Sequence, residues 1–168
     1  DCKPDRAATD DYRHVEKHVP IPSSTPTQIT VATMLGWAMT RPPDGTPRSG
    51  RELHVFEIAK GFVQFAGLNP GDCDIHIEVS DSADKTAPRV IVETPGQVPT
   101  DNEYCSARQN LQTALMSRGV SVNGAGQEVT PALPADVVGL AFQDFEHNRG
   151  TKQVATTWEL HPAIVTVH

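Results

Sequence analysis

The stretch "ELHVFEIAKGFVQFAG" (residues 52–67) decides the fold prediction for this chain. Its apolar residues alternate with polar ones and are rich in Val, Phe and Ile, a pattern that predicts a long β-strand. Gly61 interrupts this strand, and a β-bulge or a sharp bend is expected there. A long strand that bends in this way can serve both sides of a small β-barrel.

A second, shorter alternating stretch, "CDIHIEVSD", follows, and after it come three similar strands and one helix. Strands are predicted over 73–81, 88–95, 136–147 and 154–168, with a loop over 121–134. A helix is predicted over 100–119, where apolar residues recur at spacings of three and four. Pro162 in the last strand suits an edge or a bulge.

The order strand, strand, strand, helix, strand, strand (βββαββ) is that of the OB-fold, a five-stranded Greek-key barrel. The sequence therefore predicts a mainly β protein with one helix and an OB-fold-like five-stranded barrel. A generic α+β meander is the alternative. Residues 1–29 are polar and punctuated by proline, so we expect a flexible N-terminal arm there and the barrel domain over 30–168.

Composition limits the classes of function. The chain has 168 residues, 38% of them hydrophobic and 21% charged, which is typical of a soluble globular domain with a tail. Its formal net charge of −7 argues against a duplex nucleic-acid binder, which neutralises phosphates with clustered Lys and Arg. No apolar run approaches the roughly 20 residues that span a bilayer, so no membrane span is expected.

The compartment is predicted from the proline and cysteine content. Fourteen prolines, three cysteines and a first residue other than Met favour an exported bacterial protein, periplasmic or secreted. A trimmed cytoplasmic protein is the alternative. Cys73 has inward parity and Cys105 starts the helix that plugs an OB barrel, so we expect a Cys73–Cys105 disulfide after export and two buried thiols in the cytosol. The other pairing, Cys2 with Cys105, would tie the arm to the domain.

Polar side chains gather at the ends or on one face of three predicted strands. Asp, Glu and His recur with period two in the second and fifth strands and close the fourth strand, and in a barrel these segments could converge at one rim. The candidate polar site consists of Asp72, Asp74, His76, Asp144, His147, Glu159 and His161. Carboxylate and imidazole ligands on rigid strands suit zinc or manganese. The predicted metal ligands are Asp74, His76, Asp144 and His161.

Two simpler interpretations of these residues stay open. Strand alternation alone would place them on a solvated outer face. His76 and His161 could instead form hydrogen bonds with Asp144 or loop backbone and hold the strands together. The spacing is no established ligand motif, and the sequence has neither a nucleophile elbow nor a phosphate-binding loop. Catalytic residues are therefore not assigned.

Five short motifs in one order resemble a group of small, largely uncharacterised bacterial proteins with an OB-type domain. The motifs are "DCDIH" (72–76), "VIVETP" (90–95), Cys105, "FQDFEH" (142–147) and "WELHPAI" (158–164). Ala163 departs from the pattern, which has Val there. The resemblance covers residues 50–168. It implies the OB fold and implies no reaction.

These observations predict a small binding or interaction module, with a protein or a small ligand as its partner. The alternative is a metal-dependent phosphodiesterase or nuclease that uses the Asp/His face. Whether the protein is an enzyme stays open, because the sequence supplies no established catalytic motif.

Overall fold

The computed structural model describes residues 12–69, 72–96, 104–145 and 150–168. The protein is mainly β, and none of its described helices is long and apolar enough to cross a membrane. Its elements are α1 (His14–Lys17), β1 (Thr27–Ile29), α2 (Val31–Leu35), the 3₁₀ helix η1 (Gly50–Leu53), β2 (Val55–Leu68), β3 (Ile75–Ser80), β4 (Arg89–Thr94), α3 (Tyr104–Met116), β5 (Gln127–Gln143) and β6 (Val154–Val167).

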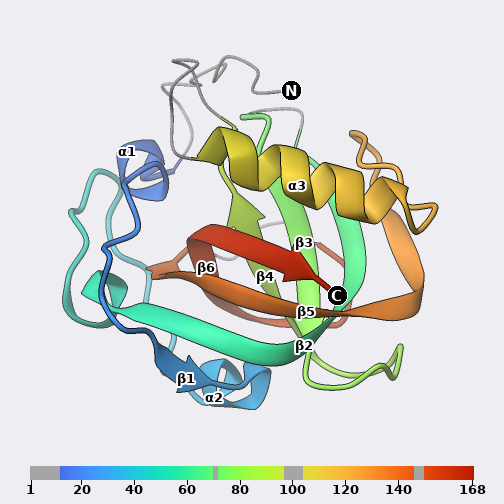
Figure 1. Cartoon of the computed structure of the whole chain (residues 1–168). Helices are drawn as coiled ribbons and strands as arrows, with labels where there is room; N and C mark the ends of the chain where they lie inside the picture. The colour runs from blue at the N-terminus through green and yellow to red at the C-terminus, as the bar shows by residue number, and fades with distance from the viewer. Residues whose placement is uncertain (1–11, 70–71, 97–103, 146–149) are drawn as a thin grey trace.

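Five of the strands form a closed barrel. They are hydrogen-bonded in the order β2, β3, β4, β6, β5, and β5 pairs again with β2 (Figure 1). β4 and β6 run parallel, and the other neighbours in the barrel run antiparallel. α3 connects β4 to β5. This mixed barrel confirms the predicted OB-like fold, because an open meander would lack the closing β2–β5 pairing.

β2 is the long strand predicted from residues 52–67. It pairs with β3 on one side and with β5 on the other, and its register with β5 shifts between Ile58 and Gly61. A Cβ atom on Gly61 would lie 2.7 Å from Cγ1 of Val79, so glycine permits this close approach. The start of the quoted stretch differs from the prediction, since Glu52 and Leu53 belong to η1.

β5 begins earlier than predicted. Residues 127–134 were expected to continue the loop, yet they extend the strand, and Gln127 pairs with Ala66 near the end of β2. The length of β2 explains the difference, because its backbone groups need partners along the whole strand. Pro131 and Pro134 turn exposed faces to solvent within this extension.

The core lies inside the barrel and under α3. Ile75, Ile77 and Val79 of β3 are fully buried, as their alternation predicts. Leu111 and Leu115 carry the buried stripe of α3 into the same cluster. The apolar residues of β3 therefore face this core, and its polar residues lie on the opposite face of the strand.

The structure corrects the expected disulfide. Cys73 is a free, buried thiol, so it does not pair with Cys105. Cys105 in α3 is disulfide-bonded, and its partner is not among the described residues. The alternative pairing names Cys2, which lies outside the described residues.

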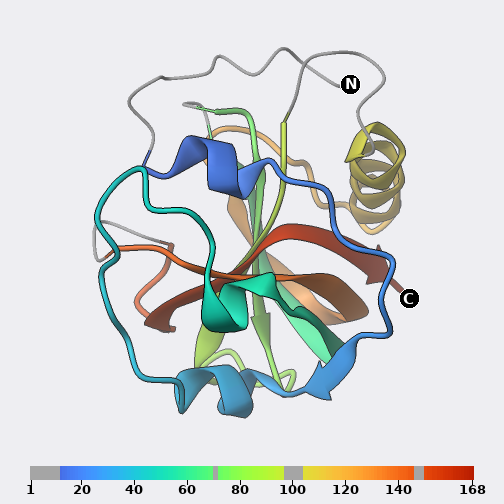
Figure 2. The same cartoon turned by 90° about the vertical axis from the view of Figure 1, so that its left-hand side faces the viewer.

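The described part of the expected arm lies against the barrel. From Tyr12 onward it contains α1 and β1, and β1 pairs in parallel with β2. Arg13 and Lys17 are buried. Figure 2 shows α1 against the upper end of the barrel. Residues 1–11 of the expected arm lie outside the described residues.

Candidate metal centre

A cluster of acidic and histidine side chains is buried where β3, β4 and β6 meet. Asp74 stands directly before β3, Glu93 near the end of β4 and His161 in the middle of β6. Asp74 and His161 have 0% exposure and Glu93 has 7%. One potential ligand atom from each residue lies within 4.8 Å of the other two. This set, the buried triad, could hold a metal ion.

Strand pairing accounts for the triad. β3 and β4 pair antiparallel with His76 opposite Glu93. β4 and β6 pair in parallel with Val92 opposite Leu160. The residues that follow these two, Glu93 and His161, are therefore close neighbours on adjacent strands. The register of three strands thus assembles side chains that are far apart in the sequence.

A β-bulge directs His161. β6 places two residues, His161 and Pro162, opposite the single residue Leu140 of β5. This count is that of a bulge and confirms the position predicted for Pro162. Bulges change the direction of the side chains that they contain. At this bulge the guanidinium of Arg48 donates a hydrogen bond to the carbonyl oxygen of His161.

Carboxylate oxygens lie close to both ring nitrogens of His161. Oδ2 of Asp74 is 3.0 Å from Nε2, and Oε2 of Glu93 is 3.1 Å from Nδ1. Neither nitrogen forms a hydrogen bond within the described part of the chain, so these contacts are ionic and lack hydrogen-bond direction. Two ligands about 2.1 Å from one metal ion are themselves about 3.0–3.4 Å apart. Each spacing suits a pair of ligands on one ion, but an ion can bind only one nitrogen of the ring.

Each triad carboxylate is oriented through its other oxygen. Oδ1 of Asp74 accepts a hydrogen bond from the backbone N–H of Gly96 at 2.6 Å. Oε1 of Glu93 lies 2.8 Å from Nδ1 of His76. Outer contacts of this kind orient the ligands in protein metal sites. One oxygen of each carboxylate is held, and the other faces His161.

The ionisation of the triad follows from competition between burial and charge pairing. Burial opposes the charged form of His161, yet Asp74, Glu159 and Glu93 raise the pKa of this imidazole well above its usual value. Burial also disfavours the charged carboxylates, but the adjacent histidines hold the pKa values of Asp74 and Glu93 well below their usual range. A metal ion at the triad would displace the proton of His161.

Two neighbours of the triad also have displaced pKa values. Burial, with the negative charges of Asp74 and Glu93, raises the pKa of Asp72 to about 7. Burial acts against the charged form of His76, but contacts with Glu78 and Glu93 raise its pKa to about 10. The surroundings of the triad therefore favour the protonated forms of both His76 and Asp72.

The candidate site predicted from the sequence is brought together in part. Asp74 and His161 meet, whereas His76 and Asp144 are outside the group of ligand atoms that could share an ion. His76 contacts Glu93 from its outer side. Asp144 accepts the backbone N–H of Phe145 at the end of β5. His147 lies outside the described residues.

The interpretation as a solvated outer face is wrong for most of these residues. The buried members are Asp72, Asp74, Asp144, Glu159 and His161. Oδ1 of Asp72 accepts the backbone N–H of Asp74 at 2.9 Å, so its role is to shape the turn before β3. Glu159 lies 3.4 Å from the ring of His161.

Sequence reasoning missed two residues, Glu93 and His18. Glu93 lies in the quoted motif "VIVETP", and pairing the second and third predicted strands would have placed it beside His76. His18 approaches the triad from the N-terminal segment, with Nε2 3.6 Å from Oδ1 of Asp74. No local pattern connects a residue at position 18 with strands that begin more than fifty residues later.

Comparison with known proteins finds no matching family model, no matching curated relative and no matching solved structure. The resemblance to small bacterial OB-type proteins stays a prediction. The functional argument therefore depends on the geometry of the buried triad.

Proposed function

We propose that this protein is a metal-binding OB-type module whose buried triad of Asp74, Glu93 and His161 holds one divalent ion, zinc or manganese. The observation that carries the proposal is that the three buried side chains each offer a ligand atom within 4.8 Å of those of the other two. Mixed imidazole and carboxylate ligands suit both ions.

The burial of the triad favours binding over hydrolysis. A catalytic metal keeps an open coordination position that substrate can reach. Two of the three proposed ligands have no exposed surface, and the third is 7% exposed. A bound ion would instead tie β3, β4 and β6 together, and its binding free energy would add to the stability of the barrel.

The test is a calorimetric titration of the metal-free chain with Zn²⁺ and with Mn²⁺. We expect one ion per chain, with binding lost in Asp74→Asn and in His161→Gln. His54→Ala is the matched control, because His54 is exposed and lies outside the group of ligand atoms that could share an ion. A hundredfold excess of ion over the dissociation constant would stabilise the fold by about 2.7 kcal/mol. That corresponds to roughly 5–11 °C in Tm for a chain of this size.

Circular dichroism of each variant separates loss of binding from loss of folding, and Glu93→Gln serves as a third ligand variant. A folded wild-type chain that takes up neither ion would refute the proposal. Binding that survives in both ligand variants would place the ion elsewhere. In either case the triad would be a buried ion-pair cluster in which a proton on His161 takes the place of the metal.

An extracytoplasmic location remains part of the proposal. The disulfide at Cys105 supports it, because disulfides persist mainly in oxidising compartments. Counting reactive thiols in the denatured chain before and after reduction tests the bond. An unchanged count would remove this support.

A further inference from the structure

One side of the barrel, next to α2 and η1, carries exposed arginine and apolar side chains. Figure 2 shows the chain rising along this side from α2 toward α1 before it returns to η1. Met39 and Leu53 are 58% and 59% exposed, and Arg41 and Arg51 are exposed as well. We call these side chains, with the half-buried ring that lies among them and the buried ring beneath them, the basic surface. Its residues are Trp37, Met39, Arg41, Arg51, Leu53 and Trp158.

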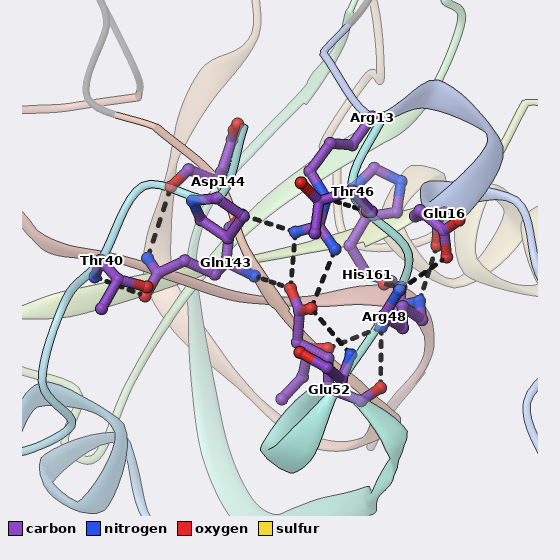
Figure 3. A network of polar contacts seen from close by, with 12 residues as sticks. Arg13, Glu16, Thr40, Thr46, Arg48, Glu52, Gln143, Asp144 and His161 are labelled. Carbon is purple, nitrogen blue, oxygen red and sulfur yellow. Dashed lines mark hydrogen bonds and ion pairs between the residues drawn. The ribbon is translucent and has the colours of Figure 1, made fainter. Parts of the chain in front are cut away.

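Hydrogen bonds to the barrel fix the backbone of this surface. Nε1 of Trp158 in β6 donates to the carbonyl oxygen of Ala38 at 2.9 Å. The backbone N–H of Thr40 donates to Oε1 of Gln143 at the end of β5, at 3.0 Å (Figure 3). The segment 37–41 is therefore attached to two strands, and the side chains that it carries are presented from a fixed backbone.

Both arginines of the basic surface lie over aromatic rings. The guanidinium carbon of Arg51 is 4.4 Å from the ring centroid of Trp37 and 5.2 Å from that of Trp158. The guanidinium carbon of Arg41 is 4.8 Å from the ring centroid of Phe145. Aromatic rings attract a cation at these distances, so each guanidinium is held in place before any ligand binds. Such preorganisation lowers the entropy cost of binding.

The N–H groups of these two guanidiniums have no acceptor in the described part of the chain, where neither forms a hydrogen bond or an ion pair. The carboxylates near them in the sequence have other partners. Glu52, next to Arg51, accepts both terminal nitrogens of Arg13 at 2.7 and 2.9 Å (Figure 3). Oδ1 of Asp44 accepts two backbone N–H groups, and Glu57 meets the amide of a glutamine in β1. A ligand of this surface must therefore supply the acceptors.

We propose that the basic surface binds a short acidic segment of a partner protein, independently of any metal at the triad. Carboxylates match the planar fork of donors on a guanidinium, and Arg41 and Arg51 offer two such forks. An apolar side chain of the same segment would pack on the exposed Met39 and Leu53. Arg, Trp and Met are the residue types that protein interfaces favour.

Charge separates this partner from other anionic ligands. The chain has a net charge of −7, which repels nucleic acid and anionic membranes, because both present phosphate over a wide area. A short acidic segment contacts only the local surface, where the exposed charges are positive. A proline-rich peptide would need open aromatic rings, and those of Trp37 and Trp158 lie under the guanidinium of Arg51.

The test is a titration of the full chain with a synthetic peptide in which Glu and Asp residues surround one Leu. Both tryptophans of the chain belong to the basic surface, so their fluorescence reports binding there. We expect saturable binding with a dissociation constant below roughly 1 mM, weakened by added salt. The same peptide with Gln and Asn in place of Glu and Asp should not bind.

Variants assign the binding to the two guanidiniums. Calorimetry measures their affinities, because Arg51→Gln changes the surroundings of the tryptophans. We expect Arg41→Gln and Arg51→Gln each to bind the acidic peptide about tenfold more weakly or worse, the effect of losing one charged hydrogen bond. Arg118→Gln is the matched control and should bind like wild type, because this exposed arginine donates to the carbonyl oxygen of His168 and lies over none of the described rings.

Several outcomes would overturn the inference. They are no binding of the acidic peptide by wild type, equal binding of the Gln and Asn peptide, and wild-type affinity in both arginine variants. Preferred binding of a proline-rich peptide, of single-stranded RNA or of phosphatidylserine vesicles would assign the surface to another ligand. Light scattering that shows a dimer of wild type, and a monomer of Arg51→Gln, would assign it to a second copy of the chain.

Circular dichroism checks the fold of each variant. Should Arg51→Gln fold poorly, Arg51→Lys keeps the positive charge but loses the paired donors, and we expect it to bind the acidic peptide more weakly than wild type. Equal affinity in a folded Arg51→Lys variant would refute the role of the guanidinium fork.

Discussion

Glu52→Gln should destabilise the fold by about 3 kcal/mol. Oε1 and Oε2 of Glu52 accept hydrogen bonds from Arg13, and Oε1 also accepts the backbone N–H of Gln143 at 2.8 Å. The side chains of Arg13 and Glu52 are 0% and 4% exposed. Removing one partner of a buried ion pair costs about 3–5 kcal/mol, because the other charge is left unpaired. Glutamine keeps one acceptor oxygen, so the lower end applies.

Urea unfolding at neutral pH measures this loss, and the expected fall in Tm is roughly 6–12 °C for a chain of this size. The control Glu57→Gln should change stability by no more than about 0.5 kcal/mol. The double variant Arg13→Met/Glu52→Gln should recover part of the loss, since it removes the uncompensated guanidinium. A loss below about 1 kcal/mol in Glu52→Gln, the value of an exposed pair, would refute the reasoning.

Two further predictions concern pH and the bend of β2. Burial opposes the charge of Glu52, but Arg13 and backbone N–H groups lower its pKa in the folded state, so its stabilising contribution is complete above the unfolded value of about 4.3 and is lost as pH falls through the folded pKa. Urea unfolding between pH 7 and pH 3 should show the gap between wild type and Glu52→Gln narrowing at low pH, and a constant gap would contradict this. Gly61→Ala should cost about 1–3 kcal/mol in the same assay, because the new Cβ would lie 2.7 Å from the buried, stiff side chain of Val79. Gly124→Ala is its control, with no atom within 4 Å of the added Cβ, and equal stability of the two variants would argue against the close approach.

The order of elements was predictable because alternation is a local signal. The apolar residues of β3 and the stripe of α3 recur at the periods that their structures require. The start of β5 was missed because Gly126, Pro131 and Pro134 mark a loop locally. Only the length of β2, a distant part of the chain, shows that this segment has strand partners. Tertiary pairing overrides local composition there.

The candidate site was predictable only where its residues follow strand period. Asp74 and His161 were identified from alternation, and both belong to the triad. Identifying Glu93 required the pairing register of β3 with β4, which cannot be taken directly from the sequence. Identifying His18 required the docking of the N-terminal segment, which depends on buried contacts of Arg13 with a residue thirty-nine positions away. Asp144 was misplaced because its side chain turns back to the backbone at Phe145.

The energetic cost of the triad is itself an argument about function. Burying two carboxylates and an imidazole requires several kcal/mol of desolvation per ion, and replacing such a cluster with apolar side chains is often neutral or stabilising. The register of β3 is already specified by Ile75 and Ile77, which are fully buried, so the barrel does not need the triad to align this strand. Under the proposed function a bound ion would account for the cluster, because coordination would replace the lost hydration of the three side chains.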